Sequence, residues 1–111
     1  MRPARVAAVE ATMAKHFHTA LHSREGRVIL DLAGNIDGSS AAQVCYEIEM
    51  LGLQECSLDF SRVKAIDLFA ARVLARGLRG LRNRGVRFQV EGLPEPVAGT
   101  LCLGGVLEAL V

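Results

Sequence analysis

The sequence lacks several features that would mark particular classes of protein. It has no tryptophan, and aromatic residues make up only 5% of its 111 residues, so it offers few rings on which nucleic-acid bases could stack. It has no run near the roughly 20 apolar residues that a membrane-spanning helix requires. Neither sign of charge dominates, because the formal net charge is only +1. We therefore expect neither nucleic-acid binding nor membrane insertion.

Cysteine is also scarce and shows no pattern. The three cysteines, Cys45, Cys56 and Cys102, are odd in number and far apart in the sequence, whereas secreted domains of this size usually carry an even, patterned set. All three lie in apolar contexts, so we predict reduced thiols in the core and no disulfide. The N-terminal residues contain no continuous apolar run of the kind found in signal peptides. Together these features predict a cytoplasmic protein.

The residues that are present suit one small domain. Half of them are hydrophobic, which is enough to bury a core in a domain of this length without disulfides or a structural metal. Residues 1–15 are rich in alanine and predict an N-terminal arm or short helix. Residues 16–111 predict the domain itself.

Apolar spacing within the domain predicts alternating strands and helices. Strands are predicted at 17–21, 27–32, 56–60 and 86–90, and helices at 40–51, 68–84 and from Pro94 to Gly104, with 106–111 as a tail. The first two strands flank a polar turn and form a hairpin. Ser40 and Gln43 have the spacing of a capping box, and Asp67 is a good N-cap for the second helix. Successive strand–helix–strand units predict an α/β domain with a partly parallel sheet, which the hairpin makes mixed.

Two segments of this pattern resemble a known family. Gly34-Asn35-Ile36-Asp37 follows the second predicted strand and resembles the G-x-[IL]-D sequence that opens the first helix of STAS domains, the anti-sigma-factor-antagonist family. Residues 58–67, LDFSRVKAID, resemble that family's central strand and the loop before its switch helix. The resemblance implies a mixed sheet of four to five strands, with helices packed mainly on one side. It also implies a non-catalytic protein-interaction module.

The sequence departs from the family pattern at the switch helix. STAS domains typically read Asp-Ser-Ser-Gly-Leu there, and a partner kinase phosphorylates a hydroxyl. Here the corresponding stretch is Asp67-Leu68-Phe69-Ala70-Ala71. Both hydroxyl positions, Leu68 and Phe69, are apolar and cannot accept phosphate. We therefore predict a domain of this family without the phospho-switch.

The helix after Asp67 is predicted to have two contrasting faces. At about 100° per residue, the sector that should face the sheet holds Ala70, Leu74, Leu78 and Leu81. The opposite sector holds Phe69, Arg72, Arg76 and Arg79. No acidic residue occurs between Asp67 and Glu91 to neutralise these arginines.

An aromatic residue beside arginines is typical of interface hot spots. The alternative is that Phe69 tucks under the preceding loop and that the arginines form an ordinary solvated face. Because the resemblance implies partner binding at this end of the helix, we favour a docking face. The predicted partner-binding residues are Asp37, Asp67, Leu68, Phe69, Arg72, Arg76 and Arg79.

Other groups of residues that could carry chemistry are weaker. His16, His18 and His22 could share one strand face, but no further ligand joins them at metal-binding spacing. Asp37 and Asp67 could form a carboxylate pair for acid–base catalysis. Each is better explained locally, as a turn residue and as a helix cap. We therefore predict no metal, no cofactor and no catalysis.

The resemblance implies a protein partner of one of two kinds. The first is an anti-sigma-factor kinase or another subunit of a signalling complex. In the alternative, the chain is an accessory STAS subunit of a bacterial lipid-transport ABC complex. The sequence also leaves a homodimer open.

Overall fold

Within residues 17–110, four strands form one mixed sheet in the order β1-β2-β3-β4. The computed structural model describes residues 17–110, so the arm predicted at 1–15 lies outside the described residues. The strands are β1 (Phe17–Arg24), β2 (Arg27–Ile36), β3 (Glu55–Ile66) and β4 (Arg87–Glu91). β1 is antiparallel to β2, whereas β2 and β4 each run parallel to β3. The predicted mixed, partly parallel sheet is confirmed.

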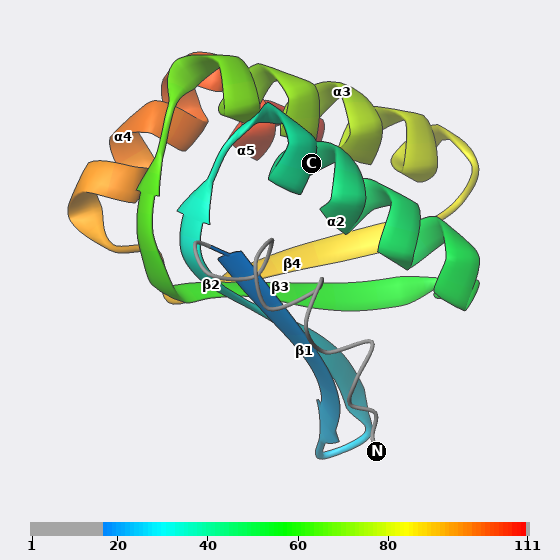
Figure 1. Cartoon of the computed structure of the whole chain (residues 1–111). Helices are drawn as coiled ribbons and strands as arrows, with labels where there is room; N and C mark the ends of the chain where they lie inside the picture. The colour runs from blue at the N-terminus through cyan, green and yellow to red at the C-terminus, as the bar shows by residue number, and fades with distance from the viewer. Residues whose placement is uncertain (1–16, 111) are drawn as a thin grey trace, which may run out of the picture.

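The described helices cover one face of this sheet (Figure 1). They are α2 (Gly38–Leu51), α3 (Leu68–Asn83), α4 (Glu95–Gly104) and α5 (Val106–Ala109). α5 replaces the tail that was predicted for residues 106–111. It is helical because Val106 and Ala109 are both buried, and α5 packs on α3. None of the described helices is long and apolar enough to cross a membrane.

The core lies between the sheet and the helices. Alternate residues of the two central strands are fully buried there, Leu30 and Leu32 in β2 and Leu58 and Phe60 in β3, as expected for one covered face of a sheet. The four residues of α3 that were predicted to face the sheet, Ala70, Leu74, Leu78 and Leu81, are all buried. The predicted orientation of α3 is therefore confirmed.

Three of the predicted strands end several residues later than expected, β1 at Arg24, β2 at Ile36 and β3 at Ile66. In the hairpin, Glu25 and Gly26 have positive φ values of 55° and 80°, which is the conformation of a tight two-residue turn. The β1–β2 pairing therefore continues to the turn itself, where Arg24 pairs with Arg27. β3 was predicted to end at Phe60, but it continues to Ile66 because its last residues pair with the end of β2.

Candidate partner-binding site

The N-terminal ends of α2 and α3 lie at one edge of the sheet because the strands before them are parallel. β2 ends at Ile36 and β3 at Ile66, and these two residues are register partners. Binding residues of α/β folds commonly gather at the carboxyl edge of parallel strands. Asp37 and Asp67 follow the two strand ends, and each caps the helix that begins there.

Asp37 is the N-cap of α2, so the capping box predicted at Ser40 is wrong. The Asp37 Oδ1 accepts hydrogen bonds from Ser40 N (2.8 Å), Ser40 Oγ (2.9 Å) and Ser39 Oγ (3.0 Å). The backbone N–H of Ser40 and then the two hydroxyls hold the pKa of Asp37 below its ordinary value. Ser40 itself is buried within the first turn. The cap falls at residue 37 because β2 ends at Ile36, leaving Asp37 to satisfy the first free helix N–H groups.

Asp67 caps α3, as predicted. Its Oδ1 accepts a hydrogen bond from Ala70 N at 2.7 Å. The cap role predicted for Asp67 is confirmed. Asp37 was predicted as a turn residue; its side chain does bond nearby backbone, but as the N-cap of a helix. Each carboxylate accepts a hydrogen bond from a backbone N–H in the first turn of the helix that follows it.

Phe69 stands in the first turn of α3 and is exposed. Phe69 is 68% exposed to solvent, and its neighbour Leu68 is 38% exposed. The ring lies against Gly38, the first residue of α2, where an added Cβ would be 2.6 Å from the Phe69 Cε2. A glycine at position 38 therefore makes room for the ring across the start of α2. The exposure predicted from the helical wheel is confirmed, whereas the contact between the two helices was not predicted.

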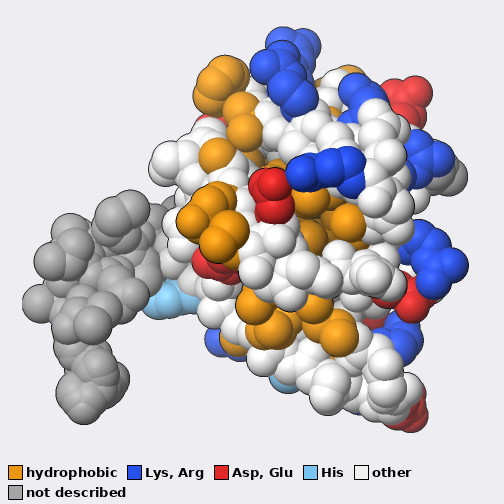
Figure 2. All heavy atoms as spheres, turned by 90° about the vertical axis from the view of Figure 1, so that its right-hand side faces the viewer, with side chains coloured by type: hydrophobic (Ala, Val, Ile, Leu, Met, Phe, Trp, Pro, Cys, Tyr) orange, Lys and Arg blue, Asp and Glu red, His pale blue; other side chains and the backbone are white. Residues whose placement is uncertain are grey.

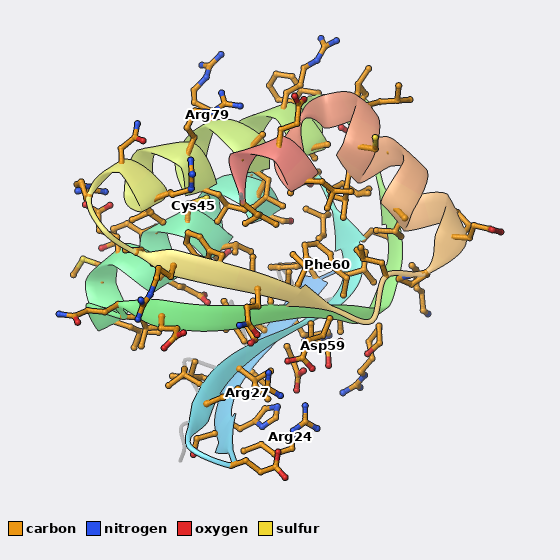
Figure 3. All side chains as sticks on the ribbon, turned by 180° about the vertical axis from the view of Figure 1, so that it is seen from behind. Arg24, Arg27, Cys45, Asp59, Phe60 and Arg79 are labelled. Carbon is orange, nitrogen blue, oxygen red and sulfur yellow. The ribbon has the colours of Figure 1, made fainter. Side chains whose placement is uncertain are left out.

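The arginines of α3 extend away from this ring along the helix. Arg72, Arg76 and Arg79 are exposed, and Figure 3 shows Arg79 pointing away from the sheet. Among residues 17–110, none of these three arginines takes part in an ion pair. A positive surface of this kind suits a partner with an acidic patch.

Leu103 adds an exposed apolar side chain that the sequence analysis missed. It lies near the end of α4 and is 78% exposed. The next residue, Gly104, packs against α3, because an added Cβ there would be 2.4 Å from the Cβ of Ala71. The end of α4 therefore lies beside the first turn of α3. Sequence reasoning missed Leu103 because almost all residues of α4 are apolar or small, so the pattern marks no outer face.

The opposite face of the sheet carries a charged cluster that was also missed. Asp31, Asp59 and Glu91 are register partners on neighbouring strands, and Figure 3 shows Asp59 pointing away from the helices and Phe60 toward them. The close contacts in the cluster are His22–Asp31 (2.8 Å), Arg24–Glu91 (3.3 Å), Arg27–Glu91 (3.4 Å) and Ser61 N–Asp59 (2.8 Å). Burial acts to raise the pKa of Asp59, but hydrogen bonds from Ser61 and the charge of Arg24 outweigh it and leave that pKa below its ordinary value. The cluster is therefore a network of ion pairs and hydrogen bonds on the open face.

The histidines do not form a site within the described residues. His18 and His22 are exposed on β1, and His16 lies outside the described residues. Within residues 17–110, no group of three or more His, Cys, Asp or Glu side chains is placed to hold a metal ion.

The three cysteines are free thiols in different environments. Cys56 is buried and Cys45 half-buried, but Cys102 is exposed. The prediction that all three lie in the core is therefore wrong for Cys102, which lies on the outer side of α4. Burial raises the pKa of Cys45 to about 11. Burial also raises the pKa of Cys56 to about 11, partly offset by a backbone hydrogen bond from Leu30.

Comparisons with known proteins agree with this fold. A family model described as "Mlab, STAS domain" matches residues 17–111. The chain is similar to the structure of an anti-sigma factor antagonist from Mycobacterium paratuberculosis, with a TM-score of 0.66 and 18% identity over 85% of this chain and 82% of that chain. It is also similar to an antisigma-factor antagonist STAS domain from Rhodobacter sphaeroides, with a TM-score of 0.58 and 20% identity over 75% of this chain and 94% of that chain.

A third similar structure belongs to a larger protein. The crystal structure of Mglu is 34% identical, with a TM-score of 0.59, over 70% of this chain and 20% of that chain. The chain thus spans about a fifth of the length of Mglu. No curated protein matches the chain.

Proposed function

Since the chain belongs to the STAS domain family, we propose that it is a non-catalytic module that binds another protein through the start of α3. The binding surface consists of Leu68, Phe69, Arg72, Arg76 and Arg79, which we call the Phe69 face. One observation carries this proposal. Phe69 is 68% exposed at the position where the family pattern has a hydroxyl.

The chemistry of the Phe69 face fits an acidic partner with an apolar pocket. Phe69 fills the pocket and loses its exposed apolar surface to the partner, which favours association. The arginines and the partial positive charge of the α3 N-terminus attract the partner's carboxylates and speed the encounter. Asp37 and Asp67 position the face, because they fix where the two helices start.

The first candidate partner is an anti-sigma-factor kinase or another subunit of a signalling complex. With Leu68 and Phe69 in place of hydroxyls, such a kinase given ATP should leave residues 66–72 unmodified, as measured by peptide mass spectrometry. If phosphate is found instead on Ser39, Ser40, Ser61 or Thr100 and changes partner affinity, the switch has moved to another residue.

The alternative is an accessory STAS subunit of a bacterial lipid-transport ABC complex. The missing hydroxyls favour this possibility, because a subunit that stays in its complex needs no phosphorylation to release it. Both candidates use the same surface and differ in the partner.

The experiment that tests the proposal compares three tagged proteins as baits in extract of the native cell. Wild type and Leu21→Ala should recover the same partner, whereas Phe69→Ala should recover much less of it. Leu21 is a suitable control because it is an exposed apolar residue on β1, at 45% exposure, away from α3. The partner's identity then distinguishes a kinase from an ABC ATPase. Equal recovery by Phe69→Ala and wild type would contradict the proposal.

A further inference from the structure

The Phe69 face continues into a groove between α2 and α3. Both helices start at the same edge of the sheet and run side by side (Figure 1). At one end the Phe69 ring lies against the start of α2. Farther along, a Cβ added to Gly77 would be 2.3 Å from the Cys45 Sγ, so the helices touch closely there. At the far end, Arg84 Nη1 and Glu49 Oε2 form an ion pair at 3.0 Å.

The groove has a largely apolar lining with charged residues beside it. Its volume is about 410 Å³, and the lining includes Ala42, Cys45 and Val73 as well as the ion-paired Glu49 and Arg84. Tyr46, which is 61% exposed, lines it from α2, and Arg76 lines it from α3. Figure 2 shows the side of the molecule on which α2 and α3 end, where several apolar patches lie in the middle around an acidic and a basic side chain, and further Lys and Arg side chains lie along the upper and right-hand edges.

Gly80 keeps this groove open. Glycine inside a helix is less favourable than alanine, because it loses more conformational freedom on folding. Gly77 is explained by its contact with Cys45, but no described atom lies within 4 Å of a Cβ added to Gly80. Packing within the described residues therefore gives no reason for glycine at this position. A second backbone that approaches α3 closely would give one.

The charges around the groove point to an acidic occupant. The arginines of α3 that form no ion pair among residues 17–110 are Arg72, Arg76, Arg79 and Arg82. The carboxylates of α2 are already engaged, Glu47 with Thr19 at 3.0 Å and Glu49 with Arg84 at 3.0 Å. The α2 of a second copy would bring only these two carboxylates, one of them already paired with Arg84, to four arginines. A partner with acidic residues of its own matches the charge better than a second copy does.

We infer that the groove binds one amphipathic, acidic helix of the protein partner, lying along α3 from Phe69 to Gly80. This inference rests on the proposed function and names the element that the partner contributes. Phe69 and Gly80 are separated by about 16 Å along the axis of α3, or about three turns. Apolar side chains spaced three and four residues apart on the partner enter the groove, and flanking carboxylates meet Arg76 and Arg79. The missing side chain at Gly80 lets the incoming backbone come close.

The test uses a fluorescein-labelled, acetylated 18-residue peptide with leucines at helical three- and four-residue spacing and glutamates elsewhere. Fluorescence anisotropy with the full chain should show saturable binding. Gly80→Leu should weaken this binding at least tenfold without lowering the melting temperature. Gly99→Leu is the matched control, because Gly99 is also a helical glycine with open space at its Cβ, but on α4; it should bind as wild type does.

Several results would overturn the inference. One is that the acidic peptide does not bind, and another is that a peptide with lysines in place of the glutamates binds equally well. Unchanged affinity of the acidic peptide for Gly80→Leu would also contradict the inference. Sedimentation of the wild-type chain as a dimer that Gly80→Leu dissociates would assign the groove to a second copy and overturn it as well. If Gly80→Leu has no effect while Phe69→Ala loses the native partner, the groove inference fails and the proposed function stands. If Phe69→Ala retains the partner, the proposed function fails whatever the peptide shows.

Discussion

Gly77 and Gly80 lie about one helical turn apart on α3. Because their neighbours differ, we expect substitution of the two glycines to change the stability of the fold in opposite directions. Gly80→Ala should raise the free energy of unfolding by about 0.5–1 kcal/mol, because alanine is the better helix former and its Cβ meets open space. Gly77→Ala should lower it by about 1–3 kcal/mol, because its Cβ would collide with the Cys45 Sγ and force the helices apart. Urea denaturation measures both changes. The same sign for the two variants would show that the α2–α3 contact is described incorrectly.

The three thiols should react with iodoacetamide in a fixed order. Cys102 is exposed and should be alkylated first in the native protein at pH 8. Cys45 and Cys56 should react slowly until the chain unfolds, because burial hinders the reagent and a pKa of about 11 keeps both as neutral thiols. Mass spectrometry of timed samples gives the order. Alkylation of Cys56 as fast as that of Cys102 would contradict its placement in the core.

The candidate site shows which residue properties a sequence can reveal. The outward position of Phe69 followed from helical periodicity, since orientation about a helix axis depends only on spacing along the chain. The contacts of Gly38 with Phe69 and of Gly104 with Ala71 join residues far apart in the sequence. Spacing along one helix carries no information about such contacts, so the groove could not be predicted.

At the scale of elements, prediction succeeded where local patterns were strong. The bounds of α3 were predicted within a residue, because a capping aspartate, an amphipathic stretch and a closing glycine all agree there. β3 was underpredicted because polar residues follow Phe60, while the backbone pairing with β2 that extends the strand is not visible in the sequence. The start of α2 was misplaced because Ser40 and Asp37 both suit a cap, and the end of β2 decided between them.

The Asp37 cap should make α2 sensitive to acid. The pKa of Asp37 is lower in the folded chain than its ordinary value of 3.8, so its stabilisation is present above that value and is lost as pH falls through the folded pKa. Asp37→Ala should cost about 1 kcal/mol at pH 7, and this cost should shrink below pH 3.8. Denaturation of both proteins across this pH range measures the difference.

Asp37→Asn is the control for the charge. Asparagine caps helices about as well as aspartate but does not titrate there. It should therefore keep most of the stability at pH 7 and lose less of it in acid than wild type does. A cost of Asp37→Ala that stays constant with pH would contradict the hydrogen bonds given to the carboxylate.

Across the whole molecule, the two faces of the sheet have different charge arrangements. On the open face, Arg24 and Arg27 each lie within 3.4 Å of Glu91. On the helical layer, by contrast, the exposed ring of Phe69 adjoins arginines that form no ion pair within residues 17–110. An exposed apolar side chain beside unpaired positive charges can be complemented by a partner that offers an apolar pocket and acidic residues. The helical layer, not the open sheet face, is therefore where we place the docking surface.

The most direct test of this account measures affinity and stability on one variant, Phe69→Ala. Calorimetric titration of the purified native partner should show binding weakened by about 1–3 kcal/mol, or about 5- to 150-fold in Kd, which is the range for truncating an interface anchor. Because Phe69 is 68% exposed in the free chain, the free energy of unfolding should change by no more than about 0.5 kcal/mol. Unchanged affinity, or a loss of stability as large as the loss of binding, would contradict the assignment of Phe69 as the docking anchor.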